Sequence, residues 1–89
     1  MKQLDRKMVG LGHFIDTTRR QMHISIEHLC AEALCSKSTY RSISLGQTTN
    51  IILYNRIIYY LREQATEERQ RQIDYAILQF FCTPAERKW

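Results

Sequence analysis

Residues that break helices are scarce in this chain. Its 89 residues include three glycines and one proline, which are Gly10, Gly12, Gly46 and Pro84. The sequence also has no low-complexity run, no internal repeat and no linker-like stretch. Apolar residues recur at spacings of three and four, which is the period of an amphipathic helix. The sequence therefore predicts one all-α domain that spans residues 1–89.

Long apolar runs are also missing. No run approaches the roughly 18 residues that a membrane-spanning helix needs. Residues 1–7, MKQLDRK, lack the apolar centre of a signal peptide. We therefore expect a cytoplasmic protein that has no contact with a membrane.

The cysteine content is low and odd. Three cysteines, Cys30, Cys35 and Cys82, do not suit a disulfide framework when no signal peptide precedes them. We interpret Cys30 and Cys35 as reduced residues that serve as small apolar side chains.

Signatures of metal binding and catalysis are absent. His23, His28, Cys30 and Cys35 form the pattern H-x4-H-x-C-x4-C, a spacing that structural zinc sites do not routinely use. The segment Gly10-Leu11-Gly12 follows no strand and lacks the third glycine of a phosphate-binding loop. We predict no metal, no cofactor and no enzymatic activity.

Charge is distributed unevenly. The net charge is +4, but residues 1–62 hold nine Lys or Arg against four Asp or Glu, a net charge of +5. Residues 63–89 hold four against five, a net charge of −1. A basic segment is the electrostatic footprint of a polyanionic partner, although an ordinary basic surface has the same total.

The first three predicted helices lie in the basic segment. One runs from about Leu4 to Arg20 and is weakened by its two glycines. The next spans residues 26–33 after the capping residue Ser25. The third spans residues 37 to about 44, after the capping residue Ser36, and Gly46 ends it.

Two longer helices follow. The fourth begins near Thr49 or Asn50, ends near Arg62, and is so apolar that we expect it to be buried on more than one side. The fifth follows the capping residue Thr66 and stops before Pro84. We expect this helix to pack or dimerise through its apolar residues, Ile73, Ala76, Ile77, Phe80 and Phe81.

The second and third helices are short and only residues 34–36 separate them, which predicts a helix-turn-helix. Short polar and cationic side chains can pair with base edges in the DNA major groove, and acidic ones would be repelled by phosphate. The start of the third helix offers such side chains and no acid: Ser36, Lys37, Ser38, Thr39, Arg41 and Ser42.

The stretch ISIEHLCAEALCSKSTYRSISLG, residues 24–46, resembles the helix-turn-helix of the phage repressor and Cro family, also called the xenobiotic-response-element family. The family pattern, roughly L-S-x-x-x-L-A-x-x-L-G-V-S-x-S-x-I-S-x-I-x-x-G, aligns with it without a gap. The matches are Ile24, Ser25, Leu29, Cys30 for a small Ala, Ser36, Ser38, Ile43 and Gly46.

This chain departs from the family pattern at four positions. Leu34 replaces the turn glycine, Ala33 a core Leu, and Tyr40 a core Ile, while Ile26 stands where a phosphate-contacting polar residue is common. The segment LCSKSTY is also similar to Rgg/PlcR-type regulators, whose long repeat domain has no room in 89 residues.

The resemblance implies a repressor-like regulator of transcription that binds double-stranded DNA. It places base reading on Lys37, Ser38 and Ser42, with Thr39 and Arg41 in support. It places phosphate contacts on residues that cap or connect the helices, which are Ser25, Ser36, Gln47, Thr48, Thr49 and Asn50. Arg19 and Arg20 either add charge to this surface or simply end a solvated helix. We expect Tyr40 and Ile43 to belong to the core.

The aromatic content leaves a second interpretation open. Several aromatic residues lie in the last two helices and beyond, and some of them suit a surface that another chain covers: Tyr54, Tyr59, Tyr60, Phe80, Phe81 and Trp89. The covering chain is a second copy, as in family members that read two half-sites, or a different protein. The second case describes a small phage or plasmid protein that acts as an antitoxin or inhibitor.

Overall fold

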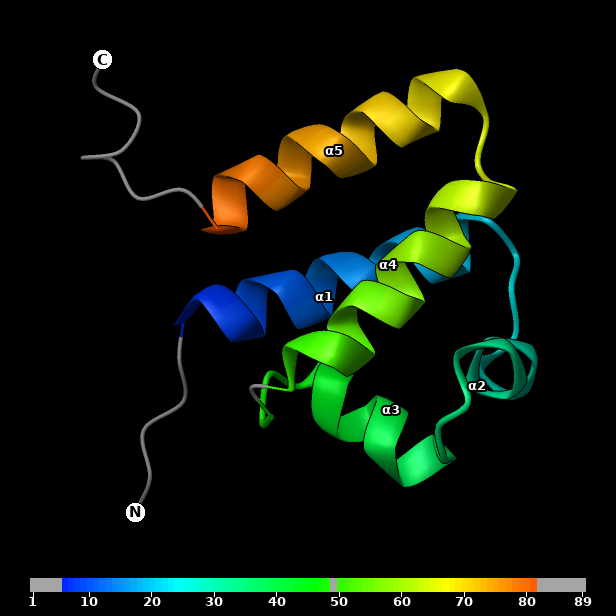
Figure 1. The fold of residues 1–89 in the computed structure, drawn as a ribbon, viewed down its shortest axis with the longest axis vertical. Coiled ribbons are helices and arrows are strands. Elements are labelled where there is room, and N and C mark those ends of the chain that lie inside the picture. Colours follow the sequence, from blue (N-terminus) through cyan, green and yellow to red (C-terminus); the bar gives the residue numbers. More distant parts are fainter. Residues whose placement is uncertain (1–5, 49, 82–89) are drawn as a thin grey trace.

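The computed structural model describes residues 6–48 and 50–81. It has five helices in these residues, α1 (Arg6–Gln21), α2 (Ile26–Ala33), α3 (Lys37–Ser44), α4 (Ile51–Gln64) and α5 (Glu67–Phe81), and no strand (Figure 1). The prediction of an all-α protein with five helices is confirmed. The predictions for Leu4, Thr49, Cys82, Pro84, Trp89 and the side chain of Phe81 lie outside the described residues.

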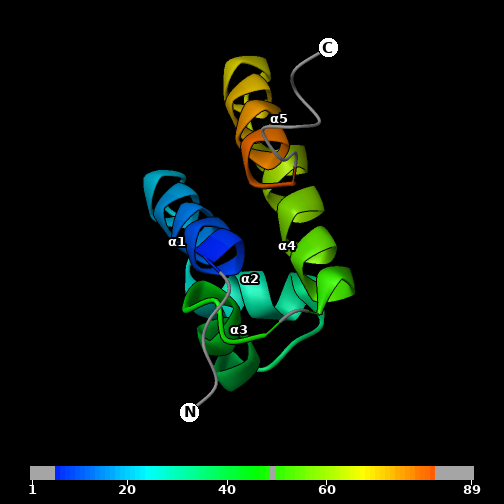
Figure 2. The ribbon, with the colours of Figure 1, turned by 90° about the vertical axis from the view of Figure 1, so that its left-hand side faces the viewer.

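Helices α1 and α4 each pack against three of the other helices. Helix α1 packs against α3, α4 and α5, and helix α4 packs against α1, α2 and α5. Helix α2 packs against α3 and α4. Figures 1 and 2 show α2 and α3 together at one end of the molecule and α5 at the opposite end. None of the helices in the described part is both long and apolar enough to span a lipid bilayer.

Capping side chains set the starts of four helices. The Ser25 hydroxyl accepts a hydrogen bond from the His28 N–H at 3.0 Å, and the Ser36 hydroxyl accepts one from the Thr39 N–H at 3.1 Å. Asn50 and Thr66 do the same for α4 and α5, at 3.3 Å in both cases. Because each cap satisfies an amide that has no partner inside its helix, the helices begin where the sequence predicts.

The core draws on all five helices. Tyr40 and Ile43 belong to it, as predicted. The largest fully buried side chains are Leu11, Ile15, Leu29, Tyr40, Ile43, Tyr54, Ile57, Leu61 and Ile73.

Two glycines allow close contacts between α1 and the end of α3 with its following loop. A Cβ atom on Gly12 would collide with the carbonyl oxygens of Ile43 and Ser44, so glycine lets α1 touch the end of α3. Gly46 has a φ of +73° and lies against the backbone of Val9, and both properties suit glycine. The α1–α3 contact therefore brings the end of α3 directly against the backbone of α1.

The turn after α2 contains a left-handed leucine. Leu34 has φ 57° and ψ 50°, and its side chain is 76% exposed. The Cys30 carbonyl accepts hydrogen bonds from the amides of Leu34 and Cys35, which is the closure of a Schellman turn. A non-glycine residue in this conformation costs about 1–2 kcal/mol, and the tight connection to α3 requires it.

The prediction that α4 is buried on more than one side is wrong. Its inner face is buried, but Ile52 and Tyr59 on its outer face are 65% and 66% exposed. Helix α5 buries Ile73 fully and three of its predicted core residues, Ala76, Ile77 and Phe80, only partly. Tyr75 and Leu78 on the same helix are 66% and 58% exposed. An apolar outer surface remains on both helices because none of the elements in the described residues covers it.

Candidate nucleic-acid interface

Helix α3 presents one polar edge outward. Figure 1 views α2 almost end-on while α3 runs across the picture, so the two helices cross steeply. Where α2 meets the start of α3, the Cys30 thiol donates a hydrogen bond to the Ser36 carbonyl at 3.6 Å. Lys37, Ser38 and Arg41 are exposed and Ser42 is half-buried. This edge contains no acidic residue.

The hydroxyl groups at the start of α3 bind one another. The Ser36 hydroxyl lies 2.8 Å from the Thr39 hydroxyl and 3.1 Å from that of Ser38, and it also accepts from the Thr39 amide. Ser36 and Thr39 are therefore occupied as a helix cap. The amides of Lys37 and Ser38, which have no acceptor within the helix, remain directed out of its N-terminus.

A glutamate that the sequence reasoning missed lies beside Lys37. The Lys37 ammonium is 3.1 Å from the Glu27 carboxylate on the first turn of α2, and both side chains are mostly exposed. Glu27 lies ten residues earlier in the sequence, so only the crossing of α2 and α3 reveals the pair. The carboxylate offsets part of the positive charge of Lys37.

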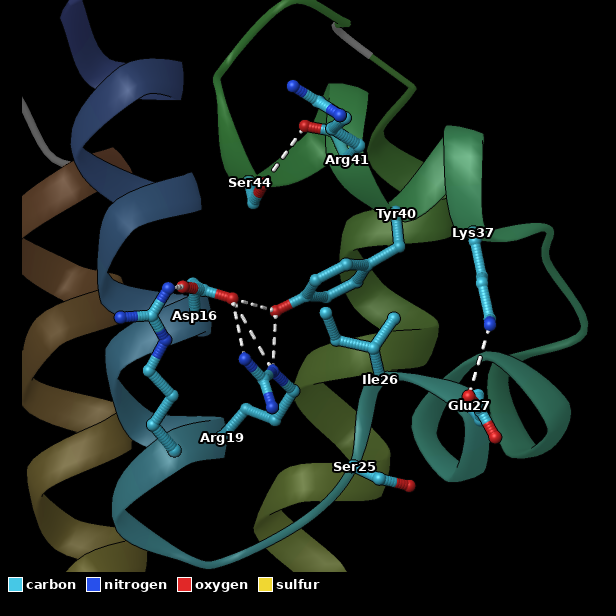
Figure 3. Close-up of a pocket in the computed structure, with 10 residues that line it drawn as sticks. Asp16, Arg19, Ser25, Ile26, Glu27, Lys37, Tyr40, Arg41 and Ser44 are labelled. Carbon is cyan, nitrogen blue, oxygen red and sulfur yellow. Dashed lines mark hydrogen bonds and ion pairs between the residues drawn. The ribbon is translucent and has the colours of Figure 1, made fainter.

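Arg41 is the cation of α3 that keeps its charge free. Within the described residues its guanidinium forms no hydrogen bond or ion pair, and only its carbonyl is used, as acceptor for the Ser44 hydroxyl at 2.9 Å. Figure 3 shows the guanidinium directed away from Asp16 and Tyr40. It is therefore available to a ligand from outside the chain.

A polar network fixes the inner face of α3. The Tyr40 hydroxyl donates to the Asp16 carboxylate at 2.7 Å and accepts from Arg19 at 3.1 Å (Figure 3). Arg19 also donates to Asp16 at 3.1 Å and to the Ile24 carbonyl at 2.8 Å. Tyr40 thus links α3 to α1.

The network changes the acidity of its members. Burial alone would raise the pKa of Asp16, but the hydrogen bonds from Tyr40 and Arg19 and the nearby arginine charges hold that pKa below its usual value. Burial and the hydrogen bond to Asp16 raise the pKa of Tyr40. Asp16 is therefore ionised and Tyr40 neutral at neutral pH.

Arg19 and Arg20 behave differently from each other. Arg19 is only 8% exposed and its guanidinium faces Asp16, Tyr40 and Ile24, so it does not add charge to the outer surface. Arg20 is exposed and forms an ion pair of 2.8 Å with Asp16. Of the two alternatives for Arg19, a surface cation and a solvated helix end, the structure supports neither.

A groove lies between the ends of α1, α2 and α3. It has a volume of about 630 Å³, and its lining includes Arg20, Ser25, Ile26, Lys37 and Arg41 (Figure 3). It brings the predicted phosphate contact Ser25 to the same surface as the predicted base-reading residue Lys37. Ile26 is 37% exposed there, so an apolar side chain separates the two.

The loop after α3 is held against α4. The buried Tyr54 hydroxyl donates to the Thr48 carbonyl at 3.0 Å, and the Thr48 hydroxyl accepts from the Asn50 amide at 3.3 Å. Asn50 uses its side chain to cap α4. Gln47 is exposed, and its side chain has no partner among the residues that the structure describes. Of the loop residues Gln47, Thr48 and Asn50, Gln47 is therefore the one whose side chain is most available to a phosphate.

Comparison of the chain with protein-family models, with curated proteins and with solved structures finds no match. In the part of the chain that the structure describes, no three His, Cys, Asp or Glu residues gather closely enough to hold a metal ion.

Proposed function

We propose that this chain binds double-stranded DNA, reads the major groove with α3 and regulates transcription, most simply as a repressor. One observation carries the proposal: the outer edge of an eight-residue helix exposes Lys37, Ser38 and Arg41, carries no acid, and is fixed to the core through Tyr40. A rigid polar helix edge of this composition suits base edges and phosphates.

The contacts divide into reading and positioning. Arg41 donates hydrogen bonds to a guanine. When DNA binds, Lys37 leaves its ion pair with Glu27 and donates to a guanine or a phosphate instead. Ser38 and Ser42 contact neighbouring base edges. The first amides of α2 and α3 and the side chain of Gln47 bind phosphates, which fixes the register of the helix in the groove.

We propose that the DNA-bound form is a homodimer. Ile52 and Tyr59 are seven residues apart on α4, and Tyr75 and Leu78 are three apart on α5, so each pair lies on one helical face. Exposed apolar side chains on neighbouring helices suit an interface with another chain. A dimer with two-fold symmetry would read two half-sites about one helical turn apart.

Binding to a different protein is the second candidate. The same apolar side chains support it, since antitoxins and inhibitors also present such surfaces. Glu27 favours it further, because a carboxylate beside α3 repels phosphate. In this case α4 and α5 would bind the partner and α3 would have no ligand of its own.

The two candidates are separated by fluorescence anisotropy of the protein with a random pool of DNA duplexes at two salt concentrations. The bound duplexes are then sequenced. We expect affinity to fall steeply with salt and a two-fold symmetric motif to be enriched. Absence of binding at low salt would reject the DNA proposal, and a chain that copurifies would then identify the partner.

A further inference from the structure

Two cysteines meet at the turn between α2 and α3. Cys30 lies four residues before the left-handed Leu34, and Cys35 follows it directly. The Cys35 amide donates to the Cys30 carbonyl at 3.0 Å. In a Schellman turn these are the two positions whose side chains touch, and they are usually occupied by apolar residues. Here both positions carry thiols.

The two thiols have different surroundings. Cys30 is 6% exposed and donates to the Ser36 carbonyl, whereas Cys35 is half-buried. Burial raises the pKa of Cys30 to about 11, and the adjacent Cys35 thiol adds to the increase by its charge and a hydrogen bond. Cys30 is therefore a protonated thiol at neutral pH, and Cys35 is the one that a reagent in solution reaches first.

We infer that Cys30 and Cys35 form a site of reversible oxidation, where a low-molecular-weight disulfide such as oxidised glutathione converts them into an intrachain disulfide. The proposal stands on the turn geometry, because a disulfide requires two Cα atoms within about 4.4–6.8 Å of each other. A backbone hydrogen bond joins these same two residues and favours that separation.

The reaction balances in two exchanges. The Cys35 thiolate attacks one sulfur of the reagent, forms a mixed disulfide and releases one glutathione thiolate, which takes up a proton. The Cys30 sulfur gives its proton to water, attacks the Cys35 sulfur and releases the second glutathione thiolate. Two protein thiols are oxidised to one disulfide, and one reagent disulfide is reduced to two thiols.

The new bond would act on the start of α3. A disulfide to Cys35 would draw the Cys30 sulfur away from the Ser36 carbonyl, to which the thiol donates in the reduced chain. Ser36 is the residue that caps α3. The chain can thus sense thiol oxidation at the joint between its two short helices. This inference does not depend on the identity of the partner that α3 binds.

Mass spectrometry of the full chain carrying Cys82→Ser tests the inference. Cys30 and Cys35 are then the only thiols, and both fall in one tryptic peptide, Gln21–Lys37. The protein is held in glutathione buffers, quenched with acid, alkylated and digested. We expect the peptide to lose two hydrogens and resist alkylation when oxidised glutathione is in excess. Reduced glutathione should restore two alkylation sites.

The control variant Cys30→Ser removes the second thiol and should stop at a mixed disulfide on Cys35. Circular dichroism before and after oxidation verifies that the helices persist. A Cys82→Ser chain that accumulates the mixed disulfide, or that keeps two alkylated thiols in excess oxidised glutathione, would overturn the inference. Should Cys30→Ser fail to fold, Cys35→Ser supplies the control, and Cys30 should then remain unmodified.

Discussion

The outer edge of α3 and the outer faces of α4 and α5 are both exposed, but they differ in chemistry. The α3 edge is polar, cationic and free of acid. The faces of α4 and α5 expose large apolar side chains, Ile52, Tyr59, Tyr75 and Leu78. Helix α5 lies at the end of the molecule opposite α3, and α4 runs from beside α3 toward α5 (Figure 1). This contrast is the basis for proposing two separate partners, a polyanion at α3 and a protein chain at α4 and α5.

Removing both cations of α3 should have the largest effect. Each good contact to a base contributes about 1–3 kcal/mol, so Lys37→Ala with Arg41→Ala should weaken specific DNA binding at least about thirtyfold. Fluorescence anisotropy on an enriched duplex measures the loss. The matched control is Arg56→Ala with Arg71→Ala, which removes the same charge from exposed positions on α4 and α5. Equal losses of DNA affinity in the two double variants would show that the total charge of the protein alone attracts the DNA.

The inner face of α3 should affect stability and leave recognition unchanged. Tyr40→Phe removes the donor to Asp16 and the acceptor for Arg19, so the free energy of unfolding should fall by about 1–3 kcal/mol. Urea denaturation measures this change. DNA affinity per folded molecule should stay the same, because the hydroxyl faces α1. A large loss of affinity in the folded variant would contradict the separation of the two faces.

Self-association should depend on the outer face of α4. A charge in an apolar interface is costly, so Tyr59→Glu should weaken dimer formation by about 1–2 kcal/mol, roughly five- to thirtyfold. Sedimentation equilibrium measures the monomer–dimer constant. Arg71→Glu, at an exposed polar position of α5, serves as the control. An unchanged monomer–dimer constant in the Tyr59→Glu variant would show that the dimer interface does not include this face of α4.

Glu27 offers a smaller change in the opposite direction. An exposed ion pair contributes roughly 0.2–1 kcal/mol, so Glu27→Gln should release Lys37 and tighten DNA binding by up to about fivefold. Glu32→Gln, also on α2 and exposed, controls for the net charge. Both variants can be measured in the anisotropy assay. Weaker DNA binding after Glu27→Gln would mean that the Glu27 carboxylate supports DNA binding and does not oppose it.

The smallest expected effect is confined to acid conditions. The pKa of Asp16 lies below its usual value in the folded state, so its contribution to stability is fully present above about pH 3.9, the value in the unfolded chain. The contribution is lost as the pH falls through the folded pKa, because the unfolded chain binds the proton first. Asp16→Asn should therefore flatten the dependence of unfolding free energy on pH below about pH 4. An unchanged slope would contradict the role of the network.

Local signals explain why the helix boundaries could be predicted. Ser25, Ser36, Asn50 and Thr66 act through hydrogen bonds to amides three residues later, so short sequence windows contain all the information. The exposed residues Lys37, Ser38 and Arg41 could also be predicted, since their neighbours Tyr40 and Ile43 fixed the inner face.

Contacts between distant residues explain what was missed. The environment of Arg19 depends on Tyr40, which lies 21 residues away in the sequence. From the local sequence alone, a cation at the end of a helix is predicted to be solvated. The role of Gly12 depends on the backbone of α3, and the exposure of Tyr59 depends on the absence of a helix over α4 in the described chain. The pair of Lys37 and Glu27 likewise exists only once α2 and α3 cross.

The most direct test of the account is an NMR titration of the isotopically labelled protein with a short DNA duplex at low salt, followed through backbone amide shifts. We predict the largest shifts in residues 25–27 and 36–48, with little change on the outer faces of α4 and α5. Shifts that concentrate on residues 52–59 and 75–78 and spare α3, or no shifts at any DNA concentration, would contradict the claim that α3 is a DNA-reading surface.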